Sequence, residues 1–481
     1  MNRLALSQLE GRYDLIIIGG GITGAGIFRE AARAGVSVLL VEARDYASGT
    51  SSWSSKLVHG GLRYLKSGDL RLTAESVRER QRLLVEAPDV VEPLDFLMPL
   101  YQHARPGKNT MRMGLWLYDR FSVGGRKSEF LPPAAALATE AKIRRQGLLG
   151  AMHYQDARTD DCRLVWRLIA QGLCEGGVAR NYTRAEKLLS TAGRVSGVAL
   201  TDAESGESRE LQAGVVVNAG GVWAGSLSGQ PMGAPKLRPL RGSHLVFSQA
   251  RLPLALAISW LHPRDARPVF AYPWQGATLL GTTDLDHGDD LWNPRMSREE
   301  CDYLLEGLHW LFGPDAPDAI DAVSSFAGVR PIVDDGSSKP SSASRESALW
   351  SAPGLVGITG GKLTTFRVTA RQVLKAVSVQ LTALKLADDD LPLFTAETAT
   401  AHAQSPSIAE VCGRVGEQVV HFDDLLLRRS RLGLVQPQAD ADDWLPLMSA
   451  CRERLGWDDA RCDTEMVRYA AIMLEQHAVP L

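Results

Sequence analysis

A short glycine-rich run near the N-terminus could bind a phosphorylated group through its backbone. The run has the spacing GxGxxG, follows an apolar stretch, and comprises Gly19, Gly20, Gly21, Ile22, Thr23 and Gly24. In this pattern the first glycine permits a tight turn, the second lets the backbone approach a pyrophosphate, and the third allows close helix packing. A helix that begins here presents free N–H groups and its positive dipole end to phosphates. The run therefore indicates a dinucleotide site.

An acidic residue stands where such a site needs one. Residues 14–18 read as a buried strand, 24–34 have helical spacing, and 36–42 read as a second strand that ends at Glu42. A carboxylate at this place binds the ribose hydroxyls of a dinucleotide. The alternative is an ordinary charged residue at the end of a strand. The motif alone does not choose between FAD and NAD.

Four later side chains could accept a proton or bind an anion. His244 lies in an alternating strand and could take an alcohol proton near neutral pH, unless it is a hydrogen-bonded structural residue. Arg330 lies in an apolar stretch, where a buried guanidinium needs an anionic partner, and Arg345 follows in a polar loop. A pair of arginines suits a phosphate dianion, although each could be a surface ion pair. Lys362 follows Gly361 and adds positive charge where negative charge develops during the reaction.

Strands and helices that could position these groups are spread along the whole chain. The expected helices cover 71–87, 160–175 with Asp160 as N-cap, 362–386, and much of 408–481. Strands are expected at 195–201 and 208–217, and a hairpin at 265–287 around Trp274-Gln275-Gly276. Residues 395–407, rich in Ala, Thr and Ser, read as a linker. Asp160 and Asp161 could pass for paired acids, but helix capping is the expectation.

Composition narrows the class of protein. The chain has 481 residues, enough for two or three domains, and 45% of them are hydrophobic. A formal net charge of -3 argues against a nucleic-acid partner. The six cysteines form no CxxC pair and do not cluster with histidines, so neither a disulfide framework nor a metal site is expected. We expect no signal peptide and no spanning helix, and hence a cytoplasmic protein.

Longer motifs carry a resemblance to a known family. The flavin-loop segment Ala47–Leu65 resembles that of the FAD-dependent glycerol-3-phosphate dehydrogenases, within the D-amino-acid-oxidase-like superfamily. Further stretches match that family in the same order. They are Tyr154–Asp156, Asp160–Leu164, Val217–Gly220, Gly242–Val246, Gly281–Asp284, Gly328–Pro331, Gly360–Arg367 and Leu425–Arg431.

The resemblance implies an α/β fold with an α+β cap. A Rossmann-like FAD-binding domain is expected from 1–75, 150–235 and 325–394. An inserted antiparallel-sheet cap is expected from 76–149 and 236–324. A C-terminal helical domain, shortened relative to the family, is expected at 400–481. This chain departs from the family pattern at one motif. Ser344-Arg345-Glu346-Ser347 stands where the family usually has Thr-Arg-Asp-Tyr.

The resemblance also implies the cofactor and its contacts. FAD is expected to bind non-covalently, since no cysteine lies in the flavin loop to form a thioether. His59, Arg63 and Tyr64 are expected to wall the substrate pocket, where His244, Arg330, Arg345 and Lys362 also lie. The N–H groups of residues 360–365, opening the predicted helix, are expected to face the flavin. Besides the GxGxxG residues and Glu42, the expected FAD contacts are Thr50, Ser51, Ser52, Ser55, Lys56, Gly361, Lys362, Leu363 and Thr364.

The expected reaction is oxidation of sn-glycerol 3-phosphate to dihydroxyacetone phosphate, with electrons passing to quinone. The residues do not decide between His244 and an arginine-held water as the base, or between quinone and oxygen as the acceptor. Alternatives are an amino-acid oxidase of the same fold, an enzyme for another phosphorylated or carboxylated alcohol, and a non-catalytic flavin subunit. A homodimer is possible.

The cap is expected to touch the inner face of the cell membrane. Residues 103–127 alternate basic residues with apolar and aromatic ones, and Asp119 is their only acid. Basic residues would meet anionic headgroups while Trp116 and its neighbours enter the interface. The same apolar residues could instead be the buried face of a cap helix. The basic residues are Arg105, Lys108, Arg112, Arg120, Arg126 and Lys127.

Overall fold

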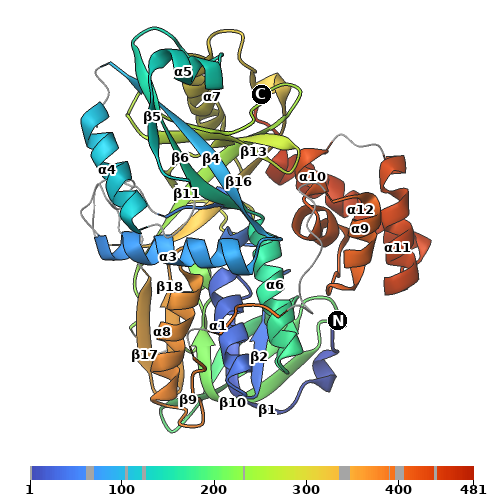
Figure 1. The fold of residues 1–481 in the computed structure, drawn as a ribbon. Helices are drawn as coiled ribbons and strands as arrows, with labels where there is room; N and C mark the ends of the chain where they lie inside the picture. The colour runs from blue at the N-terminus through green and yellow to red at the C-terminus, as the bar shows by residue number, and fades with distance from the viewer. Residues whose placement is uncertain are drawn as a thin grey trace.

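The computed structural model of the chain contains two large sheets and a separate helical region (Figure 1). One sheet and its helices occupy the lower half of the view, the second sheet occupies the upper half, and the C-terminal helices lie at one side. No helix in the described part of the chain is long and apolar enough to cross a bilayer. The structure describes residues 3–60, 70–102, 107–121, 126–230, 233–334, 347–388, 391–395, 406–437 and 441–481.

The first sheet has a parallel core with helices packed on it. Apolar residues fill the middle of β1, as expected for a strand buried on both faces. The strand order is β17-β18-β10-β1-β2-β7, and β8 and β9 extend it beyond β10. The strands are β1 (Arg12–Ile18), β2 (Val38–Val41), β7 (Val178–Arg180), β8 (Thr183–Thr191), β9 (Arg194–Asp202), β10 (Ser208–Asn218), β17 (Ala348–Ala352) and β18 (Leu355–Thr359).

Three helices pack together on this sheet. They are α1 (Ile22–Arg33), α6 (Asp161–Cys174) and α8 (Phe366–Ser378), and their buried faces join one hydrophobic cluster with β1 and β2. The Asp160 side chain accepts a hydrogen bond from the N–H of Arg163, so the predicted N-cap is confirmed. The helix predicted at 362–386 is shorter than expected. Residues 362–365 lie outside the helix, with Thr365 as the N-cap of α8, and α8 ends at Ser378.

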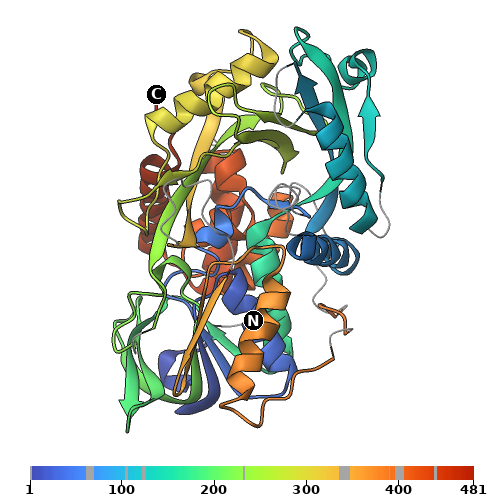
Figure 2. The ribbon, with the colours of Figure 1, turned by 90° about the vertical axis from the view of Figure 1, so that its left-hand side faces the viewer.

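The second sheet is mostly antiparallel and curves over the first (Figure 2). The predicted hairpin is confirmed, with Gln275 and Gly276 at its turn. The strand order is β15-β11-β14-β13-β12-β4-β6-β3, with β16 beside β11 and β5 beside β6. The strands are β3 (Leu57–Val58), β4 (Val91–Tyr101), β5 (Glu129–Leu131), β6 (Leu148–Thr159), β11 (Leu237–Ser248), β12 (Ala257–Leu261), β13 (Pro268–Trp274), β14 (Ala277–Gly281), β15 (Leu285–Asp286) and β16 (Ala322–Val333).

Sheet membership differs from the predicted division of the chain at three points. β3 lies in the segment 1–75 predicted for the FAD-binding domain, but it pairs with β6 in the second sheet. β6 and β16 belong to the second sheet, whereas the boundaries predicted at 150 and 325 cut through both strands. The reason is that β6 pairs along its length with β4, and β16 with β11, so neither strand can belong to the first sheet. The helices associated with this half are α3 (Leu70–Glu86), α4 (Lys108–Phe121), α5 (Pro133–Thr139) and α7 (Arg298–Phe312).

The C-terminal region is helical, as predicted, and packs beside both sheets (Figure 1). Its interior includes Phe422, Leu425 and Leu434, which share a hydrophobic cluster with residues of the second sheet. The final residues return to that sheet, where the Ser325 hydroxyl donates to the carbonyl of Ala478 at 2.8 Å. The elements are α9 (Ile408–Gly413), a π-helical turn (Asp424–Arg429), α10 (Leu432–Val435), α11 (Leu445–Leu455), α12 (Asp459–Ile472) and a second π-helical turn (Met473–His477).

Candidate functional site

The GxGxxG run forms the predicted turn between β1 and α1. Gly19 has a φ of 108°, and a Cβ there would lie 2.5 Å from the carbonyl oxygen of Ala219. A Cβ on Gly24 would lie 1.8 Å from the oxygen of Gly19, so these two positions need glycine for the turn and for helix packing. A Cβ on Gly21 would meet only the Ser51 hydroxyl, at 3.2 Å. Protein packing therefore does not explain Gly21, whereas a backbone left open to a pyrophosphate does.

Glu42 lies directly against this turn. One carboxylate oxygen accepts a hydrogen bond from the N–H of Gly20 at 2.6 Å, and the other accepts from Arg44 at 3.1 Å. Burial raises the pKa of Glu42, and the N–H donors of Arg44 and Gly20 oppose that shift. The carboxylate thus stands beside the backbone that a dinucleotide approaches. That it binds ribose stays a prediction.

Residues 45–56, which overlap the first part of the family segment Ala47–Leu65, form a loop whose hydroxyl groups contact several segments. The name flavin loop refers to residues 45–56 from here on. Ser51 accepts a hydrogen bond from the N–H of Ile22 at 2.9 Å, at the first turn of α1. The Thr50 hydroxyl donates to the carbonyl of Val329, and Ser55 lies 3.0 Å from Nε2 of His244. Ser52 instead faces inward and contacts the thiol of Cys162 at 2.7 Å. The loop therefore joins the dinucleotide turn to the second sheet.

The Lys56 side chain points away from this site. It is fully buried, donates to the carbonyl of Ser52, and pairs with Asp161 at 3.0 Å. Burial and the nearby Arg431 guanidinium lower the pKa of Lys56. The ammonium of Lys56 is thus occupied by protein groups, so the predicted contact with FAD would involve the backbone of Lys56. That contact stays a prediction. For Asp161 we expected only a role in helix capping. The structure adds an ion pair between its carboxylate and the buried Lys56.

The side chain of His244, from β11, and that of Arg330, from the neighbouring strand β16, lie near each other over one face of β11. A Cβ on Gly242 would lie 2.2 Å from Arg330 Nη2, and a Cβ on Gly281 would lie 2.1 Å from His244 Cδ2. Glycine at these two positions therefore makes room for the guanidinium and the imidazole. The ring of His244 also stacks on Phe326, with 4.6 Å between ring centroids.

His244 is held in its neutral form. Burial first, and then the charges of Arg330 and Lys56, move the pKa of His244 well below its usual value. Nε2 contacts Ser55, while Nδ1 is buried and has no partner among the described residues. A buried polar atom of this kind normally has a partner. The imidazole therefore offers a nitrogen to a bound molecule at this point.

Arg330 has a protein partner that the sequence interpretation did not foresee. It donates to Asp284 at 2.9 Å and to the Thr282 hydroxyl at 3.1 Å. Asp284 is almost fully buried and also lies 3.4 Å from Arg267. Two guanidinium groups thus converge on one carboxylate among the described residues, and such a cluster suits an anionic ligand. The Gly281–Asp284 motif marked this acid in the sequence, but nothing local assigned it to Arg330.

Residues 360–365 form a loop before α8 and bring Lys362 toward α3. Positive charge at Lys362 opposes the rise in the pKa of Glu75 that burial and Glu79 cause, so the two side chains lie near each other. Glu79 pairs with Arg367 at 2.9 Å and so joins α3 to α8. Leu363 packs on the core of the first sheet and Thr364 is buried. The expected contacts of Gly361, Lys362, Leu363 and Thr364 with FAD stay predictions.

Several predicted site residues cannot be placed. Arg63, Tyr64 and Arg345 lie outside the described residues, while His59 is described and exposed. The proposed pairing of Arg330 with Arg345 on one phosphate therefore rests on the sequence. The described part contains one group of acids and a thiol with metal-like spacing, Asp160, Asp161 and Cys162. Arg431 and Lys56 occupy those carboxylates, so the group reads as a buried ion-pair cluster.

Comparison with known proteins defines the class that this fold and site indicate. Residues 14–373 match the family model DAO, FAD dependent oxidoreductase. The chain belongs to this family of FAD-dependent oxidoreductases. The cofactor is FAD, in agreement with the open Gly21 backbone beside Glu42.

Relatives within the family are more specific. The chain is 37% identical over 386 residues to the aerobic glycerol-3-phosphate dehydrogenase of Bacillus subtilis, covering 79% of this chain and 69% of that protein. It is 38% identical over 376 residues to the same-named protein of Staphylococcus aureus, covering 77% and 67%. The glycerol-3-phosphate dehydrogenase of Bacillus halodurans, solved with FAD, matches with a TM-score of 0.79 and 26% identity over 97% of this chain and 95% of that one.

Oxidases of other substrates share the fold. Glycine oxidase of Geobacillus kaustophilus matches with a TM-score of 0.58 at 20% identity, over 80% of this chain and 98% of that one. At this identity the likeness shows the fold alone. The fold therefore does not separate an alcohol dehydrogenase from an amine oxidase, and the side chains of the site must do so.

Proposed function

We propose that this chain oxidises sn-glycerol 3-phosphate to dihydroxyacetone phosphate. The observation that carries the proposal is the pairing of a neutral histidine with a positively charged arginine cluster on one face of β11. The relatives at 37–38% identity bear the name of this activity. A carboxylate would also suit this arginine cluster, so the substrate panel below separates this activity from that of an amino-acid oxidase.

FAD supplies the hydride acceptor when it is bound. Residues 19–24 and Glu42 hold its nucleotide part, and Thr50, Ser51 and Ser55 border its course toward the second sheet. Lys362, Leu363 and Thr364 are assigned to the flavin end on the strength of the family motif. No cysteine lies in the flavin loop, which supports non-covalent binding.

Arg330 binds the substrate phosphate in this proposal. Its guanidinium is already oriented by Asp284 and Thr282, so little side-chain entropy is lost when a dianion binds. Lys362, Arg63, Tyr64 and Arg345 complete the substrate pocket. Holding the phosphate fixes the carbon that loses its hydride, which is how binding energy lowers a reaction barrier.

His244 accepts or relays the alcohol proton. Its lowered pKa keeps the imidazole neutral at neutral pH, and Nδ1 is the nitrogen without a partner among the described residues. For Nδ1 to accept the proton, the neutral ring carries its hydrogen on Nε2, which donates to the Ser55 hydroxyl. A water held by Arg330 remains the alternative base, and the geometry does not separate the two.

We infer further that the chain is peripheral on the inner face of the cell membrane and passes electrons to quinone. Helix α4 supports a surface contact, because Met113 and Trp116 are 68% and 54% exposed although both are large and apolar. The Arg120 guanidinium lies 4.7 Å from the Trp116 ring, so a cation accompanies the apolar residue. Leu115 and Tyr118 are buried, so α4 has both an inward face and an outward apolar strip.

Two of the basic residues expected at the membrane have other partners. Arg126 pairs with Glu129 at 2.8 Å, which places an acid beside it that the sequence interpretation did not consider. Lys108 lies 3.8 Å from the Phe130 ring centroid. Arg112 and Arg120, beside the exposed Met113 and Trp116, are therefore the residues that carry the membrane hypothesis. Arg105 lies outside the described residues.

The function is tested by a substrate panel with a dye as electron acceptor. Purified holoenzyme is assayed with sn-glycerol 3-phosphate, glycerol, glycine and L-proline, and kcat/KM is measured for each. We expect glycerol 3-phosphate to exceed glycerol by at least about 10³-fold, because an unfilled dianion site forfeits about 4 kcal/mol or more. Turnover of glycine or proline in preference to glycerol 3-phosphate would contradict the proposal.

A further inference from the structure

Three arginines of one C-terminal segment are buried inside the FAD-binding half of the molecule. Arg428, Arg429 and Arg431 lie beyond residue 373, where the match to the oxidoreductase family ends. Their side chains are 7%, 2% and 0% exposed. Full burial of three guanidinium groups is costly unless each is paired. The carboxylates that pair with these arginines therefore show which parts of the molecule the C-terminal segment fixes in place.

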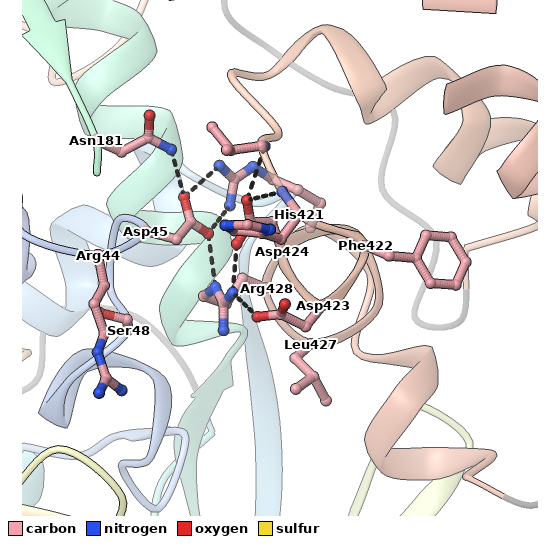
Figure 3. Close-up of polar contacts among 12 residues, drawn as sticks. Arg44, Asp45, Ser48, Asn181, His421, Phe422, Asp423, Asp424, Leu427 and Arg428 are labelled. Atoms are coloured by element: carbon pink, nitrogen blue, oxygen red, sulfur yellow. Dashed lines mark hydrogen bonds and ion pairs between the residues drawn. The ribbon is translucent and has the colours of Figure 1, made fainter. Parts of the chain in front are cut away.

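The first partner is Asp45, at the start of the flavin loop (Figure 3). Arg428 Nε and Arg429 Nη1 each donate to Oδ2 of Asp45 at 2.7 Å, and Arg429 Nη2 donates to Oδ1 at 2.9 Å. Asn181, which follows β7, adds a hydrogen bond at 2.9 Å. Burial alone would raise the pKa of Asp45, but Arg429 and Arg428 outweigh it and lower the pKa. Asp45 is therefore a charged anchor three residues after Glu42.

The second partners are Asp160 and Asp161, at the start of α6, which contact the other end of the flavin loop. Arg431 Nε donates to Asp160 at 3.1 Å, and its Nη2 donates to Asp161. Asp161 in turn accepts from the Ser54 hydroxyl at 2.7 Å and pairs with Lys56 at 3.0 Å. Arg431 has a left-handed backbone, with a φ of 69°, and its Nη1 donates to the carbonyl of Leu427 in the preceding π-helical turn at 2.9 Å.

Between these anchors lie the loop contacts that reach the cofactor site. Ser51 meets the first N–H of α1, and Ser55 meets His244. A cavity of about 630 Å³ lies beside the Asp45 cluster, between the C-terminal region and the FAD-binding half. Asp45, Trp53 and Arg428 are among the residues that line it. Ion pairs rather than continuous packing thus join the two parts here.

We propose that Arg429 and Arg431 are positioning residues of the FAD site. Arg429 fixes the start of the flavin loop through Asp45, and Arg431 fixes its end through Asp161, Ser54 and Lys56. The C-terminal domain thereby holds the loop in the shape that retains FAD and keeps Ser55 against His244. The proposal rests on FAD binding and does not depend on which substrate is oxidised.

The test compares Arg429→Met and Arg431→Met holoenzymes with wild type. The rate of FAD release is followed by the rise in flavin fluorescence after dilution. We expect both variants to release FAD about tenfold faster or more, because Asp45 and Asp161 each lose one of the two cations that hold them. Arg431→Met should also alter the flavin absorption spectrum and lower kcat more than it raises KM for the preferred substrate, since its end of the loop leads to His244, the proposed proton acceptor.

Two controls separate positioning from general destabilisation. Glu204→Gln removes an interdomain contact to His421, 3.0 Å away, that does not touch the flavin loop. It should leave FAD release and the spectrum unchanged. Arg431→Lys keeps the charge and should recover part of the wild-type release rate. Equal FAD release in wild type, Arg429→Met and Arg431→Met would overturn the proposal, as would an equal acceleration in Glu204→Gln.

A further pair of variants covers the case in which Arg429→Met does not fold. Asp45→Asn with Arg429→Met removes both charges, so no carboxylate remains buried without its cation. This double variant should fold and still release FAD faster than wild type, because the loop has lost its anchor. A folded double variant that retains FAD as wild type does would contradict the role assigned to Arg429.

Discussion

The nucleotide end and the substrate end of the FAD site obtain their shapes in different ways. At the nucleotide end, a few consecutive residues form the turn, and Glu42 meets its backbone at Gly20. At the substrate end, His244 comes from β11 and Arg330 from β16, and Asp284 follows β14. The first end depends on local backbone, and the second depends on pairing between strands distant in sequence. Glycine substitutions should therefore damage the first end, and charge substitutions the second.

The largest effect is expected from Gly24→Ala. Its Cβ would lie 1.8 Å from the oxygen of Gly19, so the turn must move, FAD binding should be lost, and the free energy of unfolding should fall by about 1–3 kcal/mol. Gly21→Ala should lower FAD affinity without lowering the melting temperature of the apo-protein, since its Cβ meets only Ser51. Calorimetry of apo-protein and FAD titration measure both.

Gly11→Ala provides a matched control for these glycine variants, because nothing lies within 4 Å of its Cβ. It should resemble wild type in both measurements. An apo-protein destabilised as much by Gly21→Ala as by Gly24→Ala would show that both glycines serve packing, and the distinction drawn at the nucleotide end would fail.

The next largest effect is expected from Arg330→Ala. Loss of one partner from a buried charged interaction costs about 2–5 kcal/mol, which should appear mainly as a higher KM for glycerol 3-phosphate while FAD is retained. Arg267→Ala removes the other guanidinium beside Asp284 and should have a smaller effect. Steady-state kinetics of both variants checks the expectation. Wild-type kinetics for Arg330→Ala would leave that residue with a structural role only.

The pH dependence of stability tests whether the contact between His421 of the C-terminal domain and Glu204 of the FAD-binding half stabilises the protein. Burial lowers the pKa of His421, but hydrogen bonds with Glu204 and Glu465 outweigh it and raise the pKa to about 9. A raised pKa in the folded state contributes stability that is fully present below about pH 6.5 and is lost as pH rises through about 9. The groups that face the imidazole also include Arg461 and Asp424.

The expected loss is roughly 3 kcal/mol for a shift of this size. Thermal melting of wild type and His421→Gln between pH 6 and pH 10 measures it. The variant should be less stable than wild type at pH 6, and the difference should shrink toward pH 10. A difference that does not change with pH would show that His421 is not charged in the folded protein.

The smallest effect is expected at α4, which belongs to neither end of the site. Arg112→Glu with Arg120→Glu should reduce flotation with anionic liposomes at low salt, since each basic residue near the surface contributes about 1 kcal/mol. Arg264→Glu with Arg298→Glu, at exposed arginines of the same half, is the control and should float as wild type does. Wild type that does not float, or variants that float alike, would exclude α4 as the membrane contact.

Sequence interpretation succeeded where a few neighbouring residues determine the structure. The turn at 19–24, the Asp160 cap and the hairpin around Gln275 follow from glycine spacing, capping chemistry and alternation. It was wrong about both ends of the helix predicted at 362–386, since α8 runs only from Phe366 to Ser378. The partners Asp284 and Arg431 were not predicted, since each contact joins segments that only the sheet pairing or the C-terminal domain brings together.

The most direct measurement is an anaerobic absorption spectrum of the holoenzyme before and after sn-glycerol 3-phosphate is added. We predict a yellow protein whose flavin absorption near its oxidised maximum is bleached by glycerol 3-phosphate. One dihydroxyacetone phosphate should form for each flavin reduced. Glycine or glycerol at the same concentration should leave the spectrum unchanged. A flavin that stays oxidised with glycerol 3-phosphate, or that is bleached by glycine instead, would contradict the central claim.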